Sequence, residues 1–131
     1  FTPEFPRHWS PTEHIAWKTP LPGRGNSSPV IWDDSLIVTA ASDDGEQRSV
    51  LCLDRRDGHL VWEATAPPPG DKEGLYWKNT FASCTPVTDG ERIITFFGNS
   101  GLLAVDFSGR RLWHRDLGTF PTMHGPGVAP V

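Results

Sequence analysis

The sequence predicts an all-β protein, and three observations support this prediction. A short phrase occurs twice, over residues 28–62 and 85–113, and starts a third time at Ala129. The composition is turn-rich, with 13 Gly and 13 Pro in 131 residues, and it includes 6 Trp. No segment keeps the apolar spacing of a helix for about ten residues without Gly or Pro. The copies of the phrase open with Ser28-Pro29-Val30, Thr85-Pro86-Val87 and Ala129-Pro130-Val131.

The chain before the first full copy contains one expected strand, at residues 14–18. There Ile15 and Trp17 alternate with their neighbours as in a half-buried strand. Residues 1–12 carry several prolines and no periodicity, so we expect irregular chain there. Residues 20–25 are expected to be a loop, because Pro and Gly break the pattern again.

The first full unit is expected to be a four-stranded antiparallel meander between residues 28 and 64. Short polar turns separate its apolar runs at residues 33–35 and 55–58, and a longer polar loop at residues 42–47 contains Gly45. Its expected strands are residues 28–32, 36–41, 49–54 and 60–64.

The second unit repeats this meander between residues 82 and 115. Asp89-Gly90 stands between two of its apolar runs and is a strong hairpin signal. An insertion at residues 65–79 separates the two units. The expected strands are residues 82–88, 92–97, 102–106 and 111–115, with a further strand opening at residues 128–131.

The spacing of the repeat indicates a β-propeller. Trp17, Trp62 and Trp113 lie 45 and 51 positions apart, and Pro86 and Pro130 lie 44 apart. A period in the mid-forties with one insertion explains these intervals. Four short strands in a period of about 40–50 residues form one propeller blade, and the Trp of each last strand offers apolar area to fill the wedge between blades.

The chain is therefore expected to be a partial β-propeller over residues 1–131, about two and a half blades of an incomplete ring. Blade 1 covers about residues 28–64 and blade 2 about residues 82–115. The closing strand at residues 14–18 and the opening strand at residues 128–131 are assigned to other blades. A closed propeller needs about 4–8 blades, so the remaining blades of the same protein, or further copies of the chain, are expected to close the ring.

Several stretches together resemble the pyrroloquinoline-quinone-like repeat family of β-propellers, named after bacterial quinoprotein dehydrogenases. Residues 9–25 are similar to the opening of large exported bacterial repeat proteins, so the chain resembles the N-terminal part of such a protein. The resemblance implies a periplasmic or extracellular location, and the same repeat builds the propeller lipoprotein of the outer-membrane protein assembly machinery. The stretches that carry the resemblance are residues 15–18, 27–30, 51–54, 58–62, 85–87, 103–106 and 112–113.

The family name raises the question of a quinone cofactor. Quinoprotein alcohol dehydrogenases carry two adjacent cysteines over the quinone and a set of calcium ligands, whereas Cys52 and Cys84 are far apart in sequence. No cofactor is therefore expected in this segment. The two cysteines are interpreted as separate buried thiols, with a structural disulfide as the alternative.

The expected function is a non-catalytic β-propeller scaffold for protein or ligand interaction in an exported bacterial protein. The alternative is a fragment of a quinone-dependent dehydrogenase, whose pyrroloquinoline quinone and calcium would be held mostly by residues outside this segment. The formal net charge is −4 and no Lys/Arg run exists, so nucleic acid is not an expected partner. No apolar run is long enough for a membrane span.

The sequence contains no motif typical of a metal site or of a nucleophilic serine. No catalytic, cofactor-binding or metal-binding residues are therefore assigned. The five His lack metal-binding spacing, and no serine lies in a Gly-x-Ser-x-Gly motif. Asp43, Asp44 and Glu46 form an acidic cluster that is interpreted as a hairpin tip, with a metal site as the alternative.

Loops that lead into the innermost strands line the top face of a propeller, so the residues of these loops are the candidate binding residues. Tyr76 and Trp77 are the best candidates for contacting a partner or ligand. In the alternative, Trp77 packs the loop down. The candidates on this face are Arg24, Asn26, Tyr76, Trp77, Lys78, Asn79 and His124.

Overall fold

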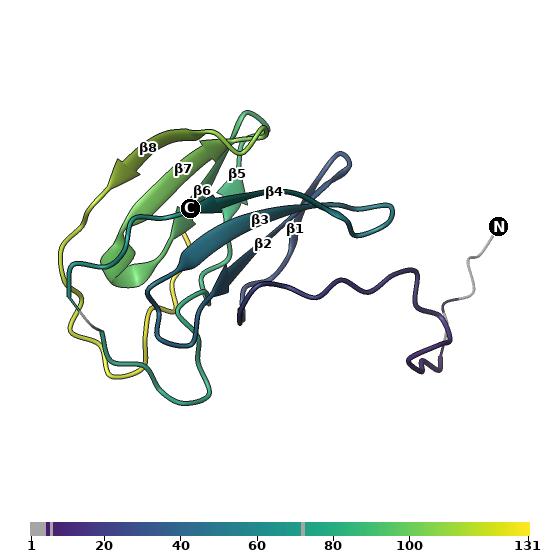
Figure 1. Ribbon diagram of the computed structural model, residues 1–131, viewed down its shortest axis with the longest axis horizontal. Helices are drawn as coiled ribbons and strands as arrows, with labels where there is room; N and C mark the ends of the chain where they lie inside the picture. The colour runs from purple at the N-terminus through teal and green to yellow at the C-terminus, as the bar shows by residue number, and fades with distance from the viewer. Residues whose placement is uncertain (1–4, 6, 72) are drawn as a thin grey trace.

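Two four-stranded antiparallel sheets contain the strands of the described residues (Figure 1). The structure is a computed structural model that describes residue 5, residues 7–71 and residues 73–131; the first residues of the segment expected to be irregular therefore lie outside the described residues. The first sheet contains β1 (Val30–Trp32), β2 (Ser35–Ala41), β3 (Arg48–Asp54) and β4 (Leu60–Thr65). The second contains β5 (Val87–Thr88), β6 (Arg92–Phe96), β7 (Leu102–Asp106) and β8 (Arg111–Arg115).

Each sheet is a meander in which strands adjacent in sequence are paired in space, as the hairpin signals predict. The all-β propeller-blade prediction is thereby confirmed. One 3₁₀ turn, η1 (Gly98–Ser100), joins β6 to β7. Within the described part of the chain, no helix is long and apolar enough to cross a bilayer.

The core lies between the two sheets and takes alternate residues from their facing strands. Ile37 of β2 and Cys52 of β3 belong to the same buried cluster as Ile93 of β6 and Val105 of β7. Because successive side chains of a strand point to opposite faces, this period-two pattern places one face of each sheet against the other. The sheets therefore pack as neighbouring blades (Figure 1).

The innermost strand of the second blade is shorter than the sequence predicts, since the expected strand at residues 82–88 is reduced to β5. The carbonyl of Ala82 accepts a hydrogen bond of 3.1 Å from the Thr39 hydroxyl. The Thr85 hydroxyl accepts one of 3.0 Å from the backbone N–H of Ser28. This segment is therefore bonded to the first blade, and it does not pair with β6.

The expected strands at residues 14–18 and 128–131 do not form in the structure. A strand needs a neighbour that takes up its backbone hydrogen bonds, and both segments were assigned to blades other than these two. Their membership of other blades stays a prediction.

The two blades are joined by a tryptophan at the outer strand of the first. Trp62 Nε1 donates a hydrogen bond of 2.9 Å to the carbonyl of Phe107 in the turn before β8. Trp17 Nε1 makes the corresponding bond of 3.0 Å to the carbonyl of Arg55, in the turn before β4. Gly109 lies under the Trp62 ring with a φ of +82°, and a Cβ there would be 2.8 Å from ring carbons.

Candidate functional site

Three loops that are distant in sequence meet at one end of the two blades (Figure 1). They are the chain before β1, the segment between β4 and β5, and the chain after β8. The backbone N–H of Asn26 donates to the carbonyl of Ala82 at 3.1 Å. The Asn26 side chain reaches the Lys78 carbonyl at 3.4 Å, so the first two loops are bonded directly.

Asn79 is the residue that holds these loops together. Its Nδ2 donates a hydrogen bond of 2.6 Å to the carbonyl of His124. Its Oδ1 accepts from Thr80 N–H at 2.9 Å and lies 3.5 Å from Asn26 Nδ2. Its own N–H donates to the Tyr76 carbonyl at 2.7 Å, which closes the turn that carries Tyr76. The loop backbone is therefore fixed at Asn79.

Beside Asn79, three rings form a contiguous surface, which we call the aromatic platform (Tyr76, Trp77 and His124). The Tyr76 ring lies 5.8 Å from that of Trp77 and 5.6 Å from that of His124, centroid to centroid. Trp77 is 71% exposed and Tyr76 42% exposed. Lys78 Nζ lies 4.8 Å from the Trp77 ring centroid, a cation–π contact. At this exposure Trp77 does not pack the loop down.

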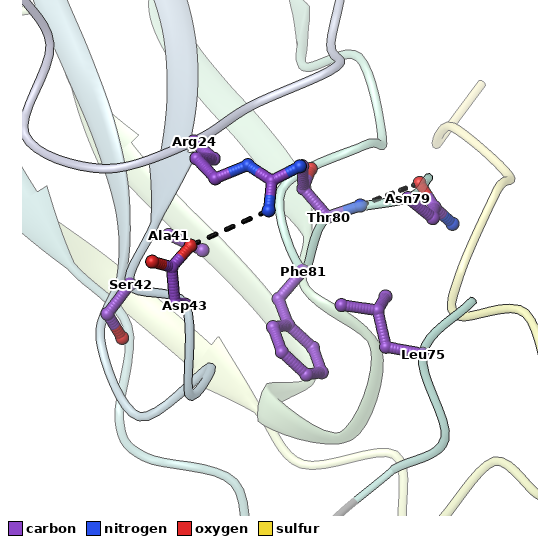
Figure 2. A pocket seen from close by; sticks show the side chains of 8 residues that line it. All are labelled: Arg24, Ala41, Ser42, Asp43, Leu75, Asn79, Thr80 and Phe81. Atoms are coloured by element: carbon purple, nitrogen blue, oxygen red, sulfur yellow. Dashed lines mark hydrogen bonds and ion pairs between the residues drawn. The ribbon is translucent and has the colours of Figure 1, made fainter. Parts of the chain in front are cut away.

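Arg24 lies at the edge of this region, where its backbone pairs with Ala41 through hydrogen bonds of 2.8 and 2.9 Å. Its guanidinium approaches Asp43 at 3.7 Å over a small depression that Thr80 and Phe81 also line (Figure 2). The depression has a volume of about 10 Å³, room for about one water molecule. It is too small for an organic ligand.

At the acidic hairpin tip, the carboxylate of Asp44 accepts hydrogen bonds from within its own loop. Asp44 Oδ1 accepts hydrogen bonds from the Ser42 hydroxyl at 2.5 Å and from the Glu46 N–H at 3.1 Å. These bonds fit the interpretation of a hairpin tip.

A second group of possible metal ligands, Asp54, Asp57 and His59, lies at the end of β3 and in the turn before β4. Their ligand atoms lie within 4.8 Å of one another. However, the Asp54 carboxylate accepts bonds of 3.0 and 2.5 Å from the Arg56 guanidinium, which hold its pKa well below the usual range. Asp57 is bonded to His59 at 2.7 Å. The hydrogen bonds of Asp54 and Asp57 therefore lie within the turn and stabilise it.

Both cysteines are free and buried, in agreement with the interpretation as separate thiols. Cys52 lies in β3, whereas Cys84 lies in the non-strand chain before β5. Burial raises the pKa of both thiols, that of Cys84 to about 11.

A larger apolar cavity of about 470 Å³ lies on the outer face of the second sheet. Phe96 and Leu102, which pair with each other, line it from β6 and β7. Residues of the chain after β8 line its other side, and Phe120 stacks edge-on against Phe96 at 5.3 Å. The propeller fold predicts another blade on this face.

One exposed apolar residue beside the platform was missed by sequence reasoning. Met123 is 83% exposed and directly precedes His124. A lone Met in a loop gives no periodic signal, so only the structure places it there.

Four-stranded meanders stacked face to face and joined by a tryptophan define the class of the protein as a β-propeller repeat protein. The chain belongs to the family of the outer membrane protein assembly factor BamB, whose family model matches residues 9–126. The predicted resemblance to the pyrroloquinoline-quinone-like repeat is thereby confirmed.

A solved structure gives the same fold. The chain is similar to the crystal structure of BamB from Moraxella catarrhalis, with a TM-score of 0.57 and 20% sequence identity. The match covers 82% of this chain and 30% of that chain, so this chain spans about a third of the length of that structure. Comparison with curated proteins gave no match.

Proposed function

We propose that this chain is part of a β-propeller that acts as a rigid, non-catalytic scaffold in an exported bacterial protein and binds a protein partner through the aromatic platform. Arg24, Asn26 and Asn79 form its polar border. A family named for outer membrane protein assembly supports a protein partner and a periplasmic location.

The observation that carries this proposal is an exposed tryptophan on an ordered loop. Trp77 keeps 71% of its surface exposed while Asn79 fixes the loop backbone on one side of it. Trp and Tyr are enriched among the residues that contribute most to protein–protein binding. Because the backbone is already ordered, binding costs little further conformational entropy.

The shape of the surface favours a protein over a small molecule. Small-molecule sites are concave and enclose most of their ligand, in cavities of about 300–1,000 Å³. None of the three platform rings lines the depression of about 10 Å³ beside Asn79 or the larger cavity of about 470 Å³. Exposed rings outside these cavities, with a polar border, fit the anatomy of a protein interface.

Site-specific photo-crosslinking in the full-length protein tests the proposal. A benzophenone amino acid at position 77 is expected to give one defined protein adduct in cells. The matched control carries the same probe at Glu91, which is exposed in the β5–β6 turn at the other end of the blade. An adduct that also forms from position 91, or no adduct from position 77, would count against the proposal.

The quinone-dependent alternative predicts a different result. Pyrroloquinoline quinone and calcium added to the full-length protein would then support reduction of a redox dye by an alcohol substrate. We expect no dye reduction above that of the protein without quinone. A signal that requires both quinone and calcium would overturn the non-catalytic assignment.

A further inference from the structure

A buried ion pair lies between the two blades and the loop that carries the platform. Arg48 Nη1 is 2.5 Å from Glu73 Oε1, and their side chains are 2% and 0% exposed. Among the ion pairs of the described residues, this is the one whose two side chains are both buried. Burying both charges needs close geometry and further hydrogen bonds.

The Arg48 guanidinium has those further partners. Its Nε donates to the Gly45 carbonyl at 2.8 Å, and its Nη1 also donates to the Phe97 carbonyl at 2.5 Å. The ring of Phe81 covers the guanidinium at 4.6 Å. Arg48 therefore links the first blade, where it begins β3, to the end of β6 in the second.

The Glu73 carboxylate completes the link. Its Oε2 accepts a hydrogen bond of 2.8 Å from the backbone N–H of Asn99, in η1 of the second blade. The Asn99 side chain donates to the Asp71 carbonyl at 3.2 Å. Glu73 thus fixes the inserted loop to both blades at once.

The aromatic platform stands between two anchors. Glu73 holds the loop just before Tyr76 and Trp77, and Asn79 holds it just after them. A buried ion pair seldom adds stability over apolar residues of similar volume, and its best-attested role is to specify one arrangement. We infer that Arg48 and Glu73 are positioning residues that fix the platform over the junction of the two blades. The consequence for binding rests on the proposed function, whereas the positioning itself does not.

Hydrogen exchange followed by mass spectrometry on the full-length protein tests the inference. Glu73→Gln removes the charge at nearly constant shape, and the double variant Arg48→Met with Glu73→Leu replaces the pair by apolar side chains. Peptides over residues 73–81 are expected to exchange about tenfold faster or more in both variants. Peptides over β7 are expected to keep their wild-type rates. The control Arg92→Met removes an exposed ion pair with Asp89 and is expected to change neither region.

Three results would overturn the inference. The first is unchanged exchange at residues 73–81 in the folded double variant. The second is an equal rise in β7, which would make the pair an ordinary core stabiliser. The third is a double variant that does not fold. If Glu73→Gln fails to fold while the double variant folds, hydrogen exchange at residues 73–81 of the double variant alone tests the inference.

The two proposals fail in different ways. Suppose that exchange in the loop is faster in the two variants, and that the probe at position 77 gives no adduct in the otherwise unchanged protein. This result would support the positioning role and remove the platform as a binding surface. Unchanged exchange with a specific adduct would do the reverse.

Discussion

Trp62 Nε1 donates a hydrogen bond of 2.9 Å to the carbonyl oxygen of Phe107, 45 residues further along the chain. The bond joins the outer strand of one blade to the last turn of the next. Trp17 and Arg55 repeat the relationship one blade earlier, at 3.0 Å. The repeated Trp of the sequence is therefore a link between blades as well as apolar filling.

Replacing Trp62 by Phe tests the strength of this link. A phenyl ring fills only part of the space that the indole occupies, and the N–H donor is lost, so the free energy of unfolding should fall by at least about 0.5–1.5 kcal/mol, the typical value for one hydrogen bond. Denaturant unfolding followed by circular dichroism measures the change. The control Trp9→Phe alters an exposed residue and should stay within about 0.5 kcal/mol of wild type. Equal effects of the two changes would contradict the prediction.

Gly109→Ala tests the close approach of the turn to the Trp62 ring. Gly109 has a φ of +82°, and an added Cβ would lie 2.8 Å from ring carbons of Trp62. Gly118 has a similar φ of +79°, but an added Cβ there would meet open space. Gly118→Ala therefore introduces the backbone strain of a positive φ without a steric clash. We expect Gly109→Ala to destabilise the protein by at least about 1 kcal/mol more than Gly118→Ala, as measured by thermal unfolding. Similar losses would show that the ring moves aside without cost.

The lowered pKa of Asp106 predicts that the stability of the protein depends on pH. A hydrogen bond from the Ser108 hydroxyl, together with backbone N–H bonds of Arg110 and Ser108, lowers the pKa of Asp106 to about 2. Because the folded-state pKa lies below the unfolded value of about 3.9, the contribution to stability is present above pH 4 and is lost as the pH falls to about 2.

The variant Asp106→Asn checks this dependence. It should be less stable than wild type at pH 7, and the difference in thermal midpoint should shrink between about pH 4 and pH 2. A difference that stays constant over this range would contradict the prediction.

Cys52 and Cys84 are expected to resist alkylation in the native protein. The thiolate is the reactive form, and burial raises the pKa of both thiols, that of Cys84 to about 11. Iodoacetamide at about pH 8 should modify both in guanidinium and neither in the folded state, as read by peptide mass spectrometry. The control Met123→Cys places a thiol on an exposed side chain and should react natively. Rapid native labelling of Cys84 would contradict the buried environment.

The sequence predicts the blades well because their signals are local. Period-two patterns and turn residues such as Asp89-Gly90 depend on near neighbours in the chain, and the strands follow them. The meeting of Asn26, Asn79 and His124 was also predicted, because their loops lead into innermost strands on the same side.

The misjudged features depend on contacts between distant segments. The strand expected at residues 82–88 is mostly lost, because its polar groups bond to Thr39 and Ser28 of the other blade. The sequence gives no sign that Arg48 and Glu73 are buried, because a charged residue in a loop or at the end of a strand is usually exposed. Only the packing of both blades against the inserted loop buries them.

The Trp62 bond has a consequence for how the protein folds. Its donor belongs to the outer strand of the first blade, and its acceptor lies 45 residues later, in the last turn of the second blade. The first blade alone therefore leaves the Trp62 indole N–H without this partner. We expect the first blade to reach its full stability only when the second blade has folded against it.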